Sequence, residues 1–128
     1  MSDFIVSPPE TTDWKLSPDA LALSIVARWP DAQVGTREDP APHEALFFRL
    51  TDGDSRIEGW LATSGQSVHL DAASVEDVSR FVLWLRRQVP RDEPLLMYDQ
   101  GFNSQVTLSG GDALTERELV ERFHASAI

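Results

Sequence analysis

The chain has 128 residues, of which 41% are hydrophobic and 25% are charged, so we expect a folded protein with one domain over residues 1–128. It contains no cysteine, which excludes a disulfide framework, a thiol nucleophile and thiolate metal ligands. No stretch approaches the roughly 18 apolar residues of a membrane span, so a membrane is not an expected partner. The first residues do not resemble a signal peptide, and together with the lack of cysteine this favours a cytoplasmic protein.

Acidic residues outnumber basic ones by 21 to 11, which gives a formal net charge of -10. This charge repels the phosphate backbone, so nucleic acid is not an expected partner either. The densest basic cluster, Arg86-Arg87 with Arg91, lies near the end of a predicted helix, where cations complement the helix dipole. The acidity favours solubility or attraction to a basic protein partner.

Three helices are predicted by their capping residues. Each begins after a serine or threonine whose side chain can accept a hydrogen bond from the first turn, namely Ser17, Ser74 or Thr115. The first two end before Pro30 and Pro90, since proline cannot continue a helix. The third is short, about ten residues, and must pack against the rest of the chain to be stable.

The remaining elements are predicted to be strands. Short connections between them favour antiparallel pairing, so we expect an α+β fold in which the helices cover one face of a mostly antiparallel sheet. The expected order is α-β-β-β-α-β-β-α, with further short strands near the N-terminus and at residues 32–36. The main strands are expected at residues 45–51, 56–63 and 66–71, which form a three-strand meander, and at 95–98 and 105–108, which form a later hairpin.

Two registers are available for the first hairpin of the meander. A two-residue turn at Asp52-Gly53 would place Arg49 opposite Arg56, and directly opposed like charges are unfavourable. A four-residue loop over 52–55 instead places Arg49 opposite Glu58 and makes each cross-strand pair favourable. We therefore adopt the four-residue loop.

This register creates an unusual outer face on the meander. A two-residue loop at Ser64-Gly65 places Phe47, Trp60 and His69 in one row on the side away from the core. Large aromatics in register are more apolar than a solvated sheet face requires, so we expect this row to be covered by the third helix, the N-terminal segment or a second subunit, or to bind a ligand or protein. A second row beside it contains Arg49, Glu58 and Asp71.

The tip of the later hairpin is a second candidate surface. It combines Tyr98 and Phe102 with a glycine and amide side chains, a mixture typical of recognition loops and also of ordinary turns. Three loop lengths give similar pairings between residues 95 and 108, so the register of this hairpin stays open.

The sequence contains no recognisable cofactor or metal motif, and we assign no catalytic residue. The three histidines, His43, His69 and His124, do not form a metal-binding helix motif. His69 is predicted on a strand close to Glu58 and Asp71. Imidazole and carboxylates together are suited to acid–base chemistry or metal binding, although a surface histidine stacked on tryptophan accounts for the same pattern.

We therefore expect a non-catalytic protein that binds another protein, a basic one being favoured, or that associates with itself as a homodimer. In size and acidity the chain is similar to bacterial immunity proteins, which neutralise toxins, but this is a likeness of bulk properties and no motif assigns a family. The alternative is a small-ligand-binding protein or enzyme with a pocket between the sheet and the helices, near His69, Glu58 and Asp71. The expected partner-binding residues are Phe47, Arg49, Glu58, Trp60, His69, Tyr98 and Phe102.

Overall fold

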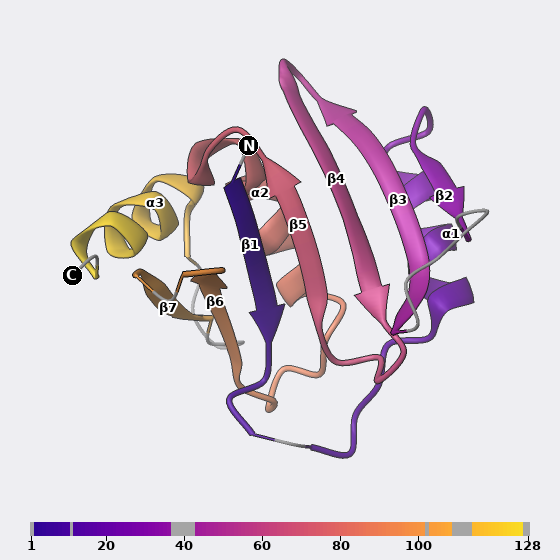
Figure 1. The fold of residues 1–128 in the computed structure, drawn as a ribbon, viewed down its shortest axis with the longest axis horizontal. Coiled ribbons are helices and arrows are strands. Elements are labelled where there is room, and N and C mark those ends of the chain that lie inside the picture. Colours follow the sequence, from indigo (N-terminus) through magenta and orange to yellow (C-terminus); the bar gives the residue numbers. More distant parts are fainter. Residues whose placement is uncertain (1, 11, 37–42, 102, 109–113, 127–128) are drawn as a thin grey trace.

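The protein is described by a computed structural model that covers residues 2–10, 12–36, 43–101, 103–108 and 114–126. These residues form three helices and one seven-stranded sheet, in which all neighbouring strands are antiparallel (Figure 1). The α+β class and the approximate order of elements are as predicted. The strands are β1 (Ser2–Ser7), β2 (Gln33–Gly35), β3 (Glu44–Asp52), β4 (Ser55–Ala62), β5 (Val68–Ala72), β6 (Leu95–Asp99) and β7 (Gln105–Leu108).

The three predicted helix starts are confirmed. The helices are α1 (Pro18–Arg28), α2 (Val75–Arg86) and α3 (Glu116–Ala125). Ser17, Ser74 and Thr115 each accept a hydrogen bond from a backbone N–H of the first turn, and Thr115 forms a complete capping box with Glu118. None of the helices within the described ranges is long and apolar enough to span a membrane.

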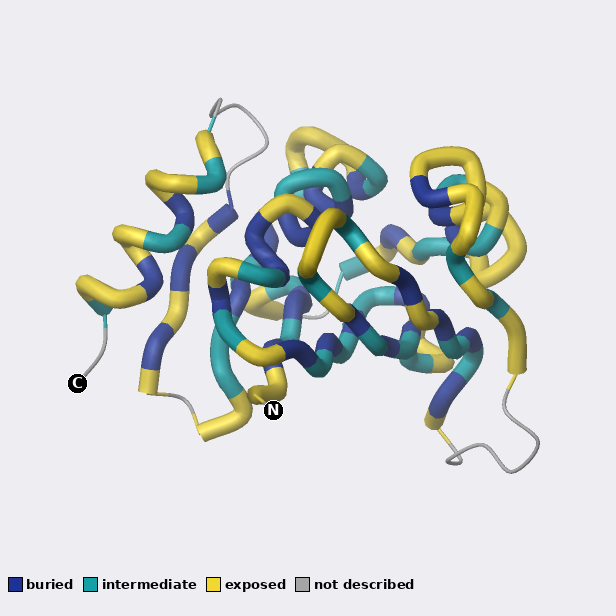
Figure 2. The backbone as a smooth tube through the Cα atoms, turned by 90° about the horizontal axis from the view of Figure 1, so that it is seen from above, coloured by how far each residue is buried: buried dark blue, intermediate teal, exposed yellow. Residues whose placement is uncertain are grey.

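The molecule has two layers, with the helices on one face of the sheet (Figure 2). Alternate residues of each strand are buried against the helices; in β3, for example, Phe48 is 0% exposed. On α2, Phe81 stacks on Phe48 at 5.3 Å and on Trp29, the residue that ends α1, at 5.4 Å. Trp84, also on α2, meets the same Trp29 ring at 5.0 Å, so a second aromatic residue joins α2 to the end of α1.

The predicted meander register is confirmed. Leu50 pairs with Ile57 and Arg49 pairs with Glu58, as the four-residue loop required. The ladder continues one pair further, from Asp52 to Ser55, so the turn itself is only two residues long. Its first residue, Gly53, has a φ of 63°, a conformation that glycine adopts without strain.

Gly59 in β4 provides space for the core. A Cβ atom at this position would lie 2.6 Å from Cζ of Phe48 and 2.5 Å from the carbonyl oxygen of His69. The Phe48 ring therefore occupies the space that any larger residue at position 59 would need.

The N-terminal strand has an unexpected place in the sheet. The strand order is β2-β3-β4-β5-β1-β6-β7, so β1 lies between the meander and the later hairpin and pairs with both. Ile5 is opposite His69 on β5 and opposite Tyr98 on β6. The hairpin register that the sequence left open pairs Tyr98 with Gln105 and Leu95 with Leu108.

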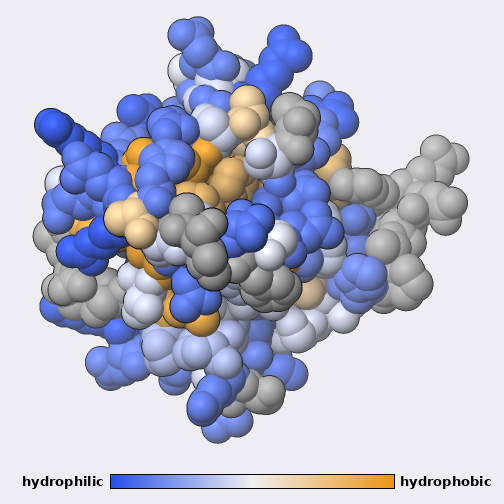
Figure 3. Space-filling model, turned by 60° about the vertical axis from the view of Figure 1, so that its left-hand side comes forward, coloured by the Kyte–Doolittle hydropathy of each residue, from blue (hydrophilic) through white to orange (hydrophobic). Residues whose placement is uncertain are grey.

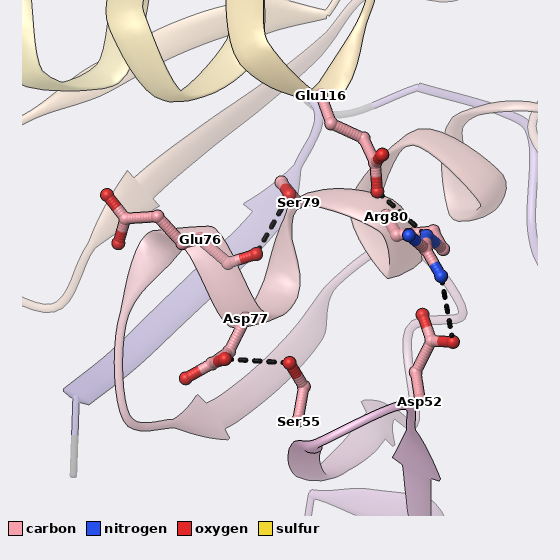
Figure 4. Close-up of polar contacts among 7 residues, drawn as sticks. All are labelled: Asp52, Ser55, Glu76, Asp77, Ser79, Arg80 and Glu116. Atoms are coloured by element: carbon pink, nitrogen blue, oxygen red, sulfur yellow. Dashed lines mark hydrogen bonds and ion pairs between the residues drawn. The ribbon is translucent and has the colours of Figure 1, made fainter.

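Polar contacts connect α2 both to the β3–β4 hairpin and to α3 (Figure 4). The Arg80 guanidinium donates to Glu116 at the start of α3 (2.8 Å) and to Asp52 at the end of β3 (3.3 Å). Ser55 donates a hydrogen bond of 2.7 Å to Asp77. These contacts fix the tip of the β3–β4 hairpin on the helix-covered side of the sheet.

Arg86 has a different role from the one expected at the end of a helix. It is only 7% exposed, and its guanidinium donates to the backbone carbonyl groups of Arg91 and Glu93, each at 2.9 Å, and of Pro90 at 3.4 Å. Burial lowers the pKa of Arg86. Arg86 therefore holds the loop between α2 and β6 in place and is not part of a basic surface.

Candidate functional site

The candidate site is the sheet face turned away from the helices, which we call the open face. Figure 1 views the sheet from this side, with α1 and α2 behind it. Cross-strand pairing aligns one residue from each of five neighbouring strands in a single row on this face. All five are half-buried. The aromatic row, in the order β3, β4, β5, β1 and β6, is Phe47, Trp60, His69, Ile5 and Tyr98.

The centre of the aromatic row is a stack of rings. The rings of Trp60 and His69 are nearly parallel, with an interplanar angle of 7° and centroids 3.9 Å apart. The ring of His43, which immediately precedes β3, lies 4.9 Å from that of Trp60 at an angle of 56°. Trp60 thus contacts two imidazole rings, one of them in a nearly parallel stack.

A row of charged residues runs beside the aromatic row. Glu58 accepts a hydrogen bond of 2.7 Å from Nε of Arg49, and the Arg49 guanidinium lies 5.7 Å from the ring centre of Phe47. Asp71 is opposite Glu58 on one side and opposite Asp3 on the other. Three carboxylates therefore occupy consecutive positions across β4, β5 and β1.

A shallow hollow of about 240 Å³ lies between the aromatic row and the charged row and is lined by residues of both. Its lining includes the carboxylates Asp3, Glu58 and Asp71 and the stacked pair Trp60 and His69. His69, Glu58 and Asp71, near which the sequence suggested an alternative ligand pocket, line this hollow, which lies on the open face and not between the sheet and the helices. Within the described ranges, no group of three or more histidine, aspartate or glutamate side chains is placed to hold a metal ion.

The environment of His69 favours its neutral form. Burial lowers the pKa of His69 below its ordinary value of 6.5, the nearby charge of His43 lowers it further, and Asp3 acts in the opposite direction. The folded environment therefore favours the uncharged imidazole more strongly than water does.

The structure brings together residues that the sequence treated as two separate surfaces. Tyr98 belongs to the aromatic row, and its hydroxyl group is 3.3 Å from that of Ser7 on β1. Phe102, the other expected residue of the hairpin tip, lies outside the described residues. The sequence did not identify Ile5, Asp3 or His43 as part of the site.

Two of the expected covers of the aromatic row are not found there. The N-terminal segment joins the sheet as β1 and does not lie over it. The third helix packs on the opposite face, where Phe123 of α3 meets the buried ring of Phe4 at 5.7 Å. Seen from the side on which α3 lies, most of the surface is hydrophilic, with apolar residues in a smaller area (Figure 3).

His124, the remaining histidine that the sequence presented, has a structural contact. His124 Nε2 is 2.9 Å from Glu76 Oε1, so His124 links α3 to α2 and lies on the helix side of the sheet.

The chain was compared with known protein families, curated proteins and solved structures, and none matches it. The open face, with its aromatic row and its hollow, is therefore the feature from which a function is inferred.

Proposed function

We propose that this protein acts in the cytoplasm by binding a basic protein partner through the open face of its sheet. The observation that carries the proposal is the aromatic row next to three carboxylates, on a face that no helix in the described part of the chain covers. Buried aromatic anchors with a polar surround are typical of protein interfaces. A net charge of -10 attracts a basic partner at long range.

A basic partner is favoured over a second copy of the chain. A symmetric dimer through this face would bring the same acidic row from each subunit to the interface, and like charges at an interface are costly. A partner with arginine and lysine side chains is attracted instead. Neutralisation of a basic protein, as bacterial immunity proteins do, is the form of this function that the size and acidity of the chain support best.

Selection of peptides from a random display library tests the proposal without a known partner. We expect the selected peptides to be rich in basic residues and to bind the Trp60→Ala variant at least about thirtyfold more weakly than the wild type, which corresponds to about 2 kcal/mol for a hot-spot residue. Fluorescence polarisation of labelled peptides measures both affinities.

The matched control is Leu23→Ala. Leu23 is the most exposed of the large apolar residues within the described ranges, at 75%, and it lies on α1 in the helix layer. Peptides that lose affinity for Leu23→Ala and not for Trp60→Ala would place the binding surface on the helix layer and contradict the proposal. A dimer seen by light scattering that Trp60→Ala dissolves would replace the basic partner with self-association.

The hollow supports a second candidate function, which is the binding of a small molecule or an enzymatic activity near His69, Glu58 and Asp71. Neutral imidazole and carboxylates could transfer protons there. Thermal unfolding in the presence of metabolites separates the two candidates, because a ligand at a hundred times its dissociation constant adds about 2.7 kcal/mol of stability. A metabolite that stabilises the wild type and not Asp71→Asn would favour the second.

A further inference from the structure

The row of carboxylates on the open face is only partly neutralised. Asp71 is directly opposite Glu58 and directly opposite Asp3, and opposed like charges destabilise a sheet. Glu58 forms an ion pair with Arg49. Within the described ranges, no arginine or lysine forms an ion pair with Asp71 or Asp3. The negative charge therefore accumulates at the β5–β1 side of the hollow.

Asp71 also has an unused hydrogen-bond acceptor. Its Oδ1 atom is buried and has no hydrogen-bond partner among the described residues. A buried polar atom without a partner is uncommon in native proteins and calls for an explanation. Asp71 is also one of the residues that line the hollow.

We propose that the hollow receives an arginine side chain of the basic partner, with the guanidinium group between the carboxylates of Asp71, Asp3 and Glu58 and against the Trp60–His69 stack. This inference rests on the proposed function and specifies how the partner is recognised. The incoming cation neutralises the opposed carboxylates, and its N–H groups donate to acceptors such as Asp71.

The size and lining of the hollow favour arginine over other cations. About 240 Å³ is below the roughly 300–1,000 Å³ of ordinary ligand pockets, so it suits one side chain. The acidic side chains are not grouped closely enough to hold a metal ion within the described residues. A guanidinium group is planar, has five N–H donors and packs on aromatic rings, whereas the ammonium group of lysine is a compact, strongly hydrated charge.

Nuclear magnetic resonance tests this inference with a defined probe. The indole N–H signal of Trp60, identified by its loss in Trp60→Phe, is followed while Nα-acetyl-arginine amide is added at constant ionic strength. We expect a saturable shift through the millimolar range. Nα-acetyl-citrulline amide has the same shape without the charge, and we expect it to bind at least about tenfold more weakly because it lacks charge-assisted hydrogen bonds.

Two matched variants distinguish the hollow from the general negative charge. Asp71→Asn is expected to weaken binding of the arginine compound by about tenfold and to leave the thermal midpoint unchanged or higher, because a like-charge contact is lost. Asp31→Asn changes the charge equally at an exposed position just after α1, and we expect less than about a twofold effect because exposed, distant charges are screened.

Each contrary result overturns the inference. Absence of a saturable shift, equal binding of the citrulline compound, or an Asp31→Asn effect as large as that of Asp71→Asn would each do so. If arginine fails while Trp60-dependent peptides are selected, the proposed function remains and its partner binds without an arginine in the hollow. If arginine binds but the selected peptides do not depend on Trp60, the proposed function fails and the hollow is a site for small cations.

Discussion

The two faces of the sheet are built from the same strands but differ in the kinds of side chain they carry and in how far these are buried. In β3, Phe48 points towards the helices and is 0% exposed, while its neighbour Phe47 lies half-buried on the open face. The helix-covered face carries almost only aliphatic and aromatic side chains, and their presence is explained by the stability that their burial gives to the fold. The open face mixes aromatic rings with histidine and carboxylates, which packing within this chain does not require. That difference is why function is sought on the open face.

The largest expected difference separates the adjacent residues Phe48 and Phe47. Phe48→Ala should lower the free energy of unfolding by about 3–5 kcal/mol, because it removes a fully buried ring that stacks on Phe81. Phe47→Ala should cost only about 1 kcal/mol, since it loses a partly exposed cross-strand pair with Trp60. Urea denaturation measures both. Equal losses would show that the two faces contribute equally to stability and would contradict the expected difference between them.

A smaller difference is expected between two arginines, one on each side of the sheet. Arg86→Gln should cost about 1.5–3 kcal/mol, because the backbone carbonyl groups of the α2–β6 loop lose a charged donor. Arg49→Gln should cost less than about 1 kcal/mol, because its ion pair with Glu58 is exposed to solvent. Chemical denaturation at low and high salt measures both, and salt should affect only the contribution of Arg49. A larger loss for Arg49→Gln would show that the open-face ion pair is structural.

The smallest expected effect concerns pH and the open face. Burial, reinforced by the charge of His43, lowers the pKa of His69 in the folded protein, so the unfolded chain binds a proton more readily. The stability that depends on neutral His69 is therefore fully present above pH 6.5 and declines as the pH falls through the lower folded-state pKa. His69→Gln should remove this part of the pH dependence. Unfolding curves recorded on both sides of pH 6.5 measure it, and an unchanged dependence in the variant would assign it to other groups.

Local patterns allowed much of the fold to be predicted from the sequence. Ser17, Ser74 and Thr115 marked the helix starts because capping depends on residues three or four positions apart. The meander register followed from favourable pairs such as Arg49 with Glu58, whose strands are joined by a short turn. The sequence pattern therefore placed Phe47, Trp60 and His69, three members of the aromatic row, on the correct face of the sheet.

The features of the site that the sequence did not reveal arise from contacts between parts of the chain that are far apart in the sequence. The pairing of Ile5 with His69 and with Tyr98 has no local signal, so the sequence could not extend the row across β1 and β6. Asp3 was missed for the same reason, and with it one of the carboxylates of the hollow. The contact of His43 with Trp60 depends on the path of the chain before β3, which residue patterns do not specify.

The position of β1 also has a consequence for how the chain folds. Along the chain this strand comes long before both of its neighbours in the sheet, β5 and β6. Pairing of β1 therefore requires contacts between segments that are far apart in the sequence, and these contacts join the meander and the later hairpin into one sheet. Such long-range closure slows folding, because the entropy of a large loop is lost before the contacts that compensate for it have formed.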